Sequence, residues 1–169
     1  MHNELTEKDI KKMREELDYR RLELMPELIE EVKRTRAFGD LSENFEYKAA
    51  KQAQRRNDSR IRYLQNMIKT AQVIDDEPET QEDAVKLYDK VTLYLPEDEE
   101  TMVIQIVTTV RVLPDQGFIS LESPLGKAVL GKKVGDTVTV RVNEHYSYDA
   151  VIQKVEEASD DGSAPLMPY

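Results

Sequence analysis

The sequence predicts an α+β protein, in which an N-terminal antiparallel α-helical coiled-coil hairpin precedes a small antiparallel β domain with one short helix. Three observations support this class. Apolar residues recur at helical spacing before residue 75, the stretch 76–83 is acidic and carries a proline, and the apolar spacing changes to two after residue 84. We therefore expect a hairpin over 1–75, a linker over 76–83, a globular domain over 84–157 and a disordered tail over 158–169.

The first helix is predicted to begin near Thr6, a residue type that caps helices and is followed by an acid three positions later. Its apolar positions are interrupted near Arg21 and are Ile10, Met13, Leu17, Leu24, Leu28 and Val32. Pro26 lies inside this pattern. Because proline lacks a backbone donor, we expect a kink or a short break there.

The second helix keeps a spacing of three and four until about Gln72, where it is predicted to end. Its stripe is Tyr47, Ala50, Gln54, Asn57, Ile61, Leu64, Ile68 and Ala71. Two helices with one stripe each can bury these stripes against each other, as in a coiled coil. An arm of this kind would be about 45 Å long.

The globular domain is predicted to be a small sheet. The strand-like segments are Val91–Leu95, Thr101–Val107, Phe118–Leu121, Val138–Val142 and Ala150–Val155. Residues 96–100 read as a hairpin loop, and 125–130 as a short helix that ends at Gly131.

Two acids, Asp40 and Glu43, lie in the segment that joins the two helices. One interpretation is structural, because an acid followed by glutamate three residues later resembles a capping box. The other is functional. Mg²⁺ prefers carboxylate oxygens but needs more ligands than two carboxylates supply, so a partner would have to complete such a site. The two interpretations are compatible, since a capping carboxylate keeps spare lone pairs.

The net charge of −10 by itself argues against nucleic-acid binding, but the charge is unevenly distributed. Residues 1–75 hold 16 basic and 15 acidic residues, a net of +1, whereas residues 76–169 hold 8 and 19, a net of −11. Residues 33–62 hold nine basic and four acidic residues, a net of +5. This surface, called here the basic collar, suits an approach to phosphates, although a solvated helix face is the simpler alternative.

Several classes of function find no support in the sequence. There is no cysteine, hence no disulfide and no thiolate metal site, and no apolar run is long enough to span a membrane. We therefore expect a cytoplasmic protein with no membrane partner. No nucleophile elbow, phosphate-binding glycine loop or HExxH helix is present, and neither His2 nor His145 has neighbours that indicate a metal site.

Three motifs carry a resemblance to a known family. They are Gly39-Asp40-Leu41-Ser42-Glu43-Asn44 followed by Glu46-Tyr47, then Ala71-Gln72-Val73-Ile74-Asp75, and then Ser123-Pro124-Leu125-Gly126 leading into Leu130-Gly131-Lys132-Lys133-Val134-Gly135-Asp136. With these motifs in this order, the chain resembles the bacterial transcript cleavage factors of the Gre family (GreA/GreB) over residues 5–155.

The resemblance implies a coiled coil that enters the secondary channel of bacterial RNA polymerase and a globular domain similar to FKBP folds. Asp40 and Glu43 would be the catalytic acids. They would hold Mg²⁺ jointly with the polymerase, so that the polymerase cleaves the displaced 3′ end of the nascent RNA. The factor itself would be no enzyme, and we expect a monomer. The expected contacts to RNA or the channel are Arg34, Arg36, Asn44, Tyr47, Arg55 and Arg56, and the expected docking loop is Ser123, Pro124 and Leu125.

The sequence also departs from the usual family pattern at three places. Phe45 follows Asn44 where a small residue is usual, residues 54–58 replace a Gly-Phe pair, and residues 143–145 replace a Pro-x-Gly turn. The first two departures flank the tip and bear on how it is presented and on which cleavage products it favours.

Two alternatives remain open at this point. A factor of the same fold could occupy the channel and inhibit transcription without cleavage, or the hairpin could belong to an adaptor unrelated to polymerase. A prolyl isomerase is not expected, because such enzymes line their pocket with aromatic residues, whereas residues 87–155 contain no Trp and one Phe, Phe118.

Overall fold

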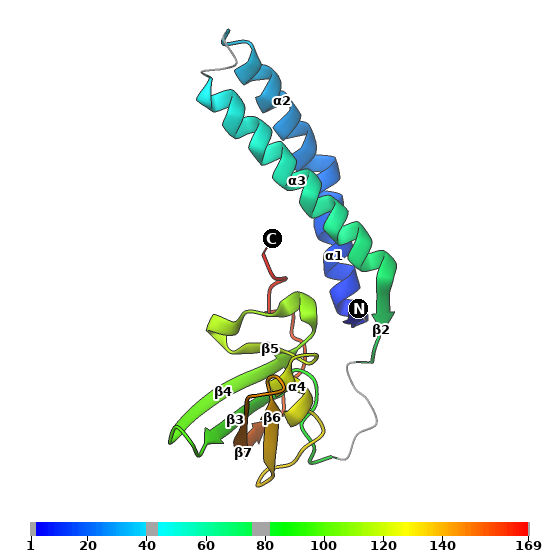
Figure 1. The fold of residues 1–169 in the computed structure, drawn as a ribbon. Coiled ribbons are helices and arrows are strands. Elements are labelled where there is room, and N and C mark those ends of the chain that lie inside the picture. Colours follow the sequence, from blue (N-terminus) through cyan, green and yellow to red (C-terminus); the bar gives the residue numbers. More distant parts are fainter. Residues whose placement is uncertain (1–2, 40–43, 76–81, 169) are drawn as a thin grey trace. The chain divides into compact units, whose positions relative to one another are not determined.

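The computed structural model describes residues 3–39, 44–75 and 82–168 and divides into two compact units (Figure 1). The helical unit comprises Lys8–Ala71 with Asn3, and the β unit comprises Gln72–Pro168 with Glu4–Glu7. Helices and sheet are thus segregated along the chain, which confirms the predicted α+β class. No helix of the described segments is long and apolar enough to cross a membrane.

The helical unit is a hairpin whose first arm contains a wide turn. Helix α1 (Glu7–Tyr19) continues through a π-helical turn, η1 (Arg20–Leu24), into α2 (Met25–Arg36), and α3 (Phe45–Thr70) forms the second arm. In η1 the Met25 N–H donates to the carbonyl of Arg20. Pro26 follows directly, and its ring would crowd the carbonyl four residues earlier in a regular helix. The irregularity predicted at Pro26 is therefore a π turn rather than a break.

The predicted stripes of the hairpin lie on its inner side. None of their residues is exposed, and the most deeply buried include Met13, Ala50, Ile61 and Leu64. Helices α2 and α3 run side by side along their length (Figure 1). This confirms the helical hairpin and its pairing face.

The segments before α1 and after α3 form a two-stranded sheet, which the sequence pattern did not indicate. Strand β1 (Asn3–Leu5) pairs with β2 (Ala71–Val73), and the Ile74 N–H donates to the Leu5 carbonyl at 2.9 Å. Helix α3 ends at Thr70, two residues before the predicted end. The apolar spacing of three and four could not show this change, because it continues into the strand.

The β unit contains a five-stranded sheet of order β5-β4-β3-β7-β6. The strands are β3 (Lys90–Leu95), β4 (Glu100–Val107), β5 (Phe118–Ser120), β6 (Thr137–Arg141) and β7 (Ser147–Glu156). All neighbours pair antiparallel except β4 and β5, which are parallel. The prediction of a purely antiparallel sheet was therefore wrong for β5. Its connection to β4 runs through two 3₁₀ turns, η2 (Thr109–Arg111) and η3 (Pro114–Gln116), rather than through a tight hairpin.

One face of this sheet forms the core together with α4 (Pro124–Val129). Alternate strand residues point into it, including Val91 and Leu93 of β3 and Ala150 and Ile152 of β7. The helix packs closely on the chain before it, because a Cβ at Gly126 would clash with the Ser120 carbonyl. The predicted short helix before Gly131 is thus present and is part of the core.

The C-terminal tail was predicted to be disordered, and for residues 158–168 this was wrong. An ion pair of 2.9 Å joins Arg111 in η2 to Asp160 in the tail, with side chains 0% and 1% exposed. Arg111 also donates to the Ala164 carbonyl at 2.7 Å, and the Met167 N–H donates to the Val110 carbonyl at 2.6 Å. A buried guanidinium requires a counter-charge and acceptors, and the tail supplies both.

Candidate functional site

The end of the hairpin is organised by Asn44. Its side-chain oxygen accepts a hydrogen bond from the Tyr47 N–H at 2.9 Å, which makes Asn44 the N-cap of α3. Its side-chain nitrogen donates to the Thr35 carbonyl at 2.7 Å, at the last turn of α2. One amide therefore begins the second arm and ties it to the end of the first arm. This structural role was missed when Asn44 was assigned to RNA or channel contact.

The two predicted catalytic acids, Asp40 and Glu43, lie outside the described residues. The capping-box interpretation of these acids can still be examined, because α3 begins at Phe45 and its N-cap is Asn44. Asp40 precedes that cap by four positions, so the prediction that Asp40 caps α3 was wrong. The N-cap position of the second helix is therefore held by Asn44 and not by Asp40.

Arg34 on the basic collar is held by neighbouring groups. It donates two hydrogen bonds to Glu31, of 2.9 and 2.6 Å, lies 3.8 Å from a carboxylate oxygen of Glu46, and has its guanidinium 5.3 Å from the centre of the Phe38 ring. The hydrogen bonds with Glu31 raise the pKa of Arg34. The side chain is still 56% exposed, so it can meet a partner while it keeps its intramolecular contacts.

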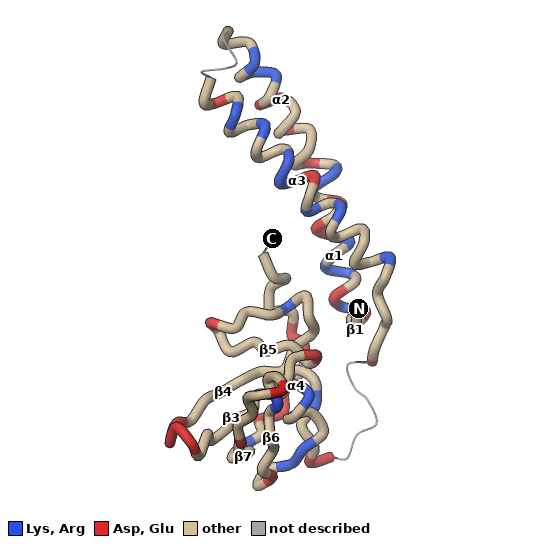
Figure 2. Tube along the Cα trace, in the orientation of Figure 1, with Lys and Arg blue, Asp and Glu red and all other residues tan. Residues whose placement is uncertain are grey.

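The other predicted collar arginines are more open. Arg36, Arg55 and Arg56 are all exposed, and the structure places no ion pair between them and another described residue. Figure 2 shows Lys and Arg along both arms of the hairpin. Tyr47 is half-buried and belongs to the inner stripe. The structure thus separates exposed basic groups from residues that hold the hairpin together.

A buried polar cluster in the middle of the hairpin was not predicted. Glu16 accepts hydrogen bonds from Arg20 at 2.7 Å and from Arg60 at 2.8 and 2.9 Å. Arg20 also donates to the Asn57 side-chain oxygen at 3.0 Å, and Asn57 donates back to the Arg20 carbonyl at 3.2 Å. We call these four residues the central cluster. An asparagine inside the apolar stripe was the one signal in the sequence that could have indicated it.

The central cluster also fixes the charge of its acid. Burial raises the pKa of Glu16, but hydrogen bonds from Arg60 and Arg20 outweigh burial and hold that pKa below its usual value. Asn57 contacts the same carbonyl, that of Arg20, that accepts from Met25 in the π turn. The cluster therefore lies where the first arm changes its helical pitch.

The predicted docking loop is only partly at the surface. Ser123 is the N-cap of α4, accepting from the Gly126 N–H at 3.0 Å and donating to the Ser120 carbonyl at 2.7 Å. Pro124 is exposed, but Leu125 is only 9% exposed and belongs to the core. A docking loop that includes Leu125 would need this leucine at the surface, and that expectation was wrong, because the first turn of α4 points the side chain at the sheet. Ser123 and Pro124 remain the accessible part of the loop.

Within the described segments no three His, Cys, Asp or Glu residues lie close enough together to hold a metal ion. His145 is exposed on the turn after β6. The predicted Mg²⁺ ligands, Asp40 and Glu43, are a set of two carboxylates, which is chemically suitable for Mg²⁺ but too small to bind it tightly alone. A site at the hairpin end would thus need ligands from a partner.

Comparison with known proteins gives two family matches that together span most of the chain. The family described as transcription elongation factor, N-terminal (GreA_GreB_N) matches residues 3–73, and that described as transcription elongation factor, GreA/GreB, C-term matches residues 80–157. Residues 158–169 lie beyond both matches.

Individual relatives agree with these matches. A protein named transcription elongation factor GreA from Mesoplasma florum is 39% identical over 146 residues, covering 86% of this chain and 93% of that protein. One of the same name from Thermoanaerobacter pseudethanolicus is 44% identical over 138 residues, covering 82% and 87%. Among solved structures, the GreA factor homolog 1 (Gfh1) protein of Thermus thermophilus is 23% identical, with a TM-score of 0.43 over 93% of this chain and 100% of that one.

Proposed function

Because this chain belongs to the GreA/GreB family of transcription elongation factors, we propose that it is an accessory factor of RNA polymerase. Its hairpin would enter the secondary channel of the polymerase and reach the displaced 3′ end of a backtracked transcript. There it would stimulate the polymerase's own Mg²⁺-dependent cleavage of the RNA and so return arrested complexes to elongation. In this proposal the factor alone has no nuclease activity.

The observation that carries the proposal is the assignment of the α3 cap to Asn44. Since Asn44 is the N-cap of α3, the acid at position 40 is not explained as that cap. Two carboxylates in the connection of a narrow hairpin are suited to bringing metal ligands into a confined site of a partner. Asn44 supports this use, because its bond to the Thr35 carbonyl fixes the two ends of the segment that carries the acids.

Asp40 and Glu43 would be the ligands that this chain offers to a shared Mg²⁺ ion. When bound, such an ion activates water and stabilises the charge of a phosphodiester transition state. The exposed Arg36, Arg55 and Arg56 would meet phosphates or acidic channel residues. On the second unit, Ser123 and Pro124 would form the contact at the channel rim, whereas Leu125 would support them from the core.

The proposal is tested on a stalled RNA polymerase complex backtracked by a defined number of nucleotides. Wild-type protein is expected to shorten the transcript, and free RNA should stay intact at the same Mg²⁺ concentration. Asp40→Asn and Glu43→Gln keep the side-chain volume but weaken metal coordination. Cleavage should fall about 100-fold, the size of losing one group that stabilises transition-state charge, while binding to polymerase persists. Added Mg²⁺ should restore part of the rate.

Two outcomes would contradict the proposal. Cleavage at the wild-type rate in both variants would show that these acids have no part in the reaction. Tight binding of the wild-type protein to the polymerase without transcript shortening would instead indicate a factor that occupies the channel and modulates transcription in another way.

A further inference from the structure

Two phenylalanines at the hairpin end make little contact with the rest of the protein. Phe38 is 57% exposed and Phe45 is 80% exposed. Phe45 is the first residue of α3, and Phe38 follows the end of α2. An aromatic ring that stays largely in water gains little from burial, so burial does not account for these two rings.

Phe38 and the residue that precedes Phe45 both bind one backbone group, the Thr35 carbonyl. The Phe38 N–H donates to it at 3.2 Å. The residue before Phe45 reaches the same oxygen, since the Asn44 side chain donates to it at 2.7 Å. Thr35 is itself buried, and its hydroxyl donates to the Glu31 carbonyl at 2.9 Å. The backbone of each ring is therefore anchored even though the rings themselves are exposed.

Each ring has a cation beside it. The Arg34 guanidinium lies 5.3 Å from the centre of the Phe38 ring, and the Lys48 ammonium lies 5.6 Å from the centre of the Phe45 ring. A cation over one face of a ring leaves the opposite face available for stacking. This pairing of an open aromatic face with a nearby cation matches a nucleotide, which offers a flat base beside a negatively charged phosphate.

We propose that Phe45, with Phe38 as a second ring, stacks on an unpaired nucleobase of the transcript, while Lys48 and Arg34 meet the adjoining phosphates. This inference rests on the proposed function, which brings the hairpin end to single-stranded RNA. Stacking on phenylalanine tolerates every base, because each base has a flat face. Such a contact would hold the displaced strand in place whatever its sequence.

The alternative ligand for the two phenylalanine rings is an apolar pocket on a protein partner. The charges argue against it. Burying the Phe45 ring in a dry pocket would also bury Lys48 next to it, and an ammonium without a counter-charge is costly to bury. A nucleotide brings its own counter-charge. The net charge of +5 over residues 33–62 favours the same ligand.

The test uses the full-length protein at saturating concentration on backtracked complexes. Phe45→Ala is expected to lower the cleavage rate about tenfold, as for one lost base–aromatic stack, and Phe38→Ala to lower it less. Phe45→Trp should retain the rate, whereas Phe45→Leu, which is apolar but cannot stack, should behave like alanine. Leu22→Ala is the matched control, because Leu22 is 73% exposed on the same hairpin. It should leave the rate unchanged.

Transcripts with a single abasic nucleotide identify the ligand. At one displaced position the abasic nucleotide should lower the wild-type rate about tenfold and leave Phe45→Ala no slower than before. Full activity of Phe45→Leu, or an equal abasic effect in wild type and Phe45→Ala, would overturn the inference. The first of these results would favour the protein pocket.

A crosslinking measurement separates this inference from the proposed function. RNA carrying 4-thiouridine at the displaced positions should crosslink to the peptide that contains Phe45, whether or not cleavage occurs. Crosslinking there without cleavage would support the stacking and refute the cleavage proposal. Normal cleavage with crosslinks only elsewhere would refute the stacking and leave the proposed function standing. A factor that does not bind the complex would refute both.

Discussion

The middle and the end of the hairpin use the same residue type in opposite ways. In the middle, Arg20 and Arg60 both bind Glu16, and the Arg60 side chain is only 5% exposed. Towards the end, Arg36 and Arg55 extend into solvent. The two regions are parts of one continuous pair of helices, so the difference arises from what each arginine faces across the hairpin. A basic residue on a helix is therefore not by itself a sign of nucleic-acid binding.

This difference bears on function as well as on stability. In the central cluster both arginines are bound to Glu16 within the hairpin. The end of the hairpin leaves positive charge outside, next to exposed aromatic rings. We expect substitutions in the middle to act on folding and those at the end to act on partners.

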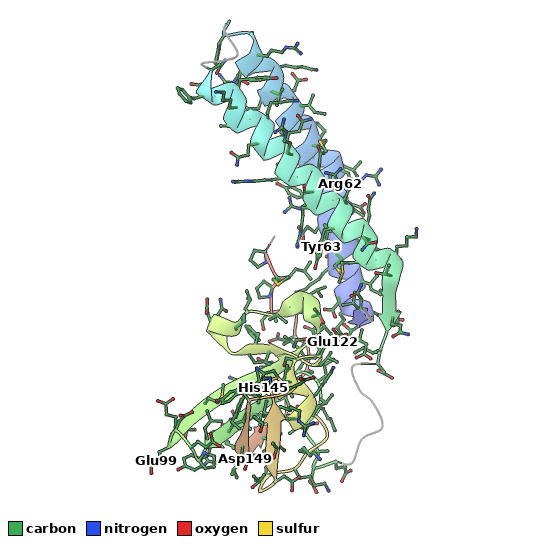
Figure 3. The ribbon with its side chains drawn as sticks, viewed as in Figure 1. Arg62, Tyr63, Glu99, Glu122, His145 and Asp149 are labelled. Carbon is green, nitrogen blue, oxygen red and sulfur yellow. The ribbon has the colours of Figure 1, made fainter. Side chains whose placement is uncertain are left out.

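The strongest effect on stability is expected from Arg60→Met. It removes one member of a mostly buried ion pair and leaves Glu16 with Arg20 as its remaining partner. Breaking such a pair costs about 3 kcal/mol, the lower end of the range, because Glu16 stays partly solvated. Urea unfolding followed by circular dichroism would measure the loss. Arg62→Met is the matched control, an exposed arginine two residues along α3 (Figure 3), and should change the free energy of unfolding by less than about 0.5 kcal/mol. Equal losses of unfolding free energy in the two variants would refute the contrast between buried and exposed arginines.

A smaller loss of stability is expected from Asn57→Ala. The change removes hydrogen bonds of 3.0 and 3.2 Å to Arg20, one of them to the carbonyl within the π turn. We expect a cost of about 1–2 kcal/mol in the free energy of unfolding. Gln54→Ala serves as the control, since Gln54 lies on the same stripe but its side chain makes no hydrogen bond to another described residue. A loss of stability in Gln54→Ala as large as that in Asn57→Ala would show that any polar side chain on the stripe contributes as much as a member of the central cluster.

The sequence allowed the fold to be predicted where periodicity was strong. The spacing of three and four places Ile61 and Leu64 on the buried face, and the alternation by two places Val91 and Leu93 in the core. The limits of most elements were right within a few residues. The class of the fold therefore follows from patterns that one chain can show by itself.

The remaining features depend on contacts between distant residues. The Arg111–Asp160 pair spans 49 positions, and composition alone made the tail look disordered. The central cluster joins Glu16 to Arg60 across 44 positions. Leu125 was misplaced for a similar reason, because whether the first turn of a short helix faces the core depends on the sheet beneath it. The acids of the tip were recognised from their motif, and their role stays a prediction.

Acid should weaken the middle of the hairpin. The folded state holds the pKa of Glu16 below its usual value. Its contribution to stability is therefore fully present above the pKa of the unfolded chain and is lost as the pH falls through the lower, folded-state value. Unfolding free energies measured from about pH 7 down to about pH 3 should fall more steeply for wild type than for Glu16→Gln, which has no proton to gain. Parallel pH curves for the two proteins would show that Glu16 does not couple folding to pH.

The smallest effect on stability, and the clearest effect on partners, is expected from the triple variant Arg36→Ala, Arg55→Ala and Arg56→Ala. These side chains are exposed, so the free energy of unfolding should change by no more than about 0.5 kcal/mol for each. If they meet phosphates or acidic channel residues, the affinity for the polymerase complex should fall. The dependence of this affinity on salt should also become weaker, because fewer counterions are released on binding when contacts are lost. Binding measured at several salt concentrations tests this, with Arg14→Ala as the control, because Arg14 is an exposed arginine of α1 outside residues 33–62. A triple variant with the wild-type salt dependence would identify the collar as a solvated helix face, and the contrast between the middle and the end of the hairpin would then concern folding alone.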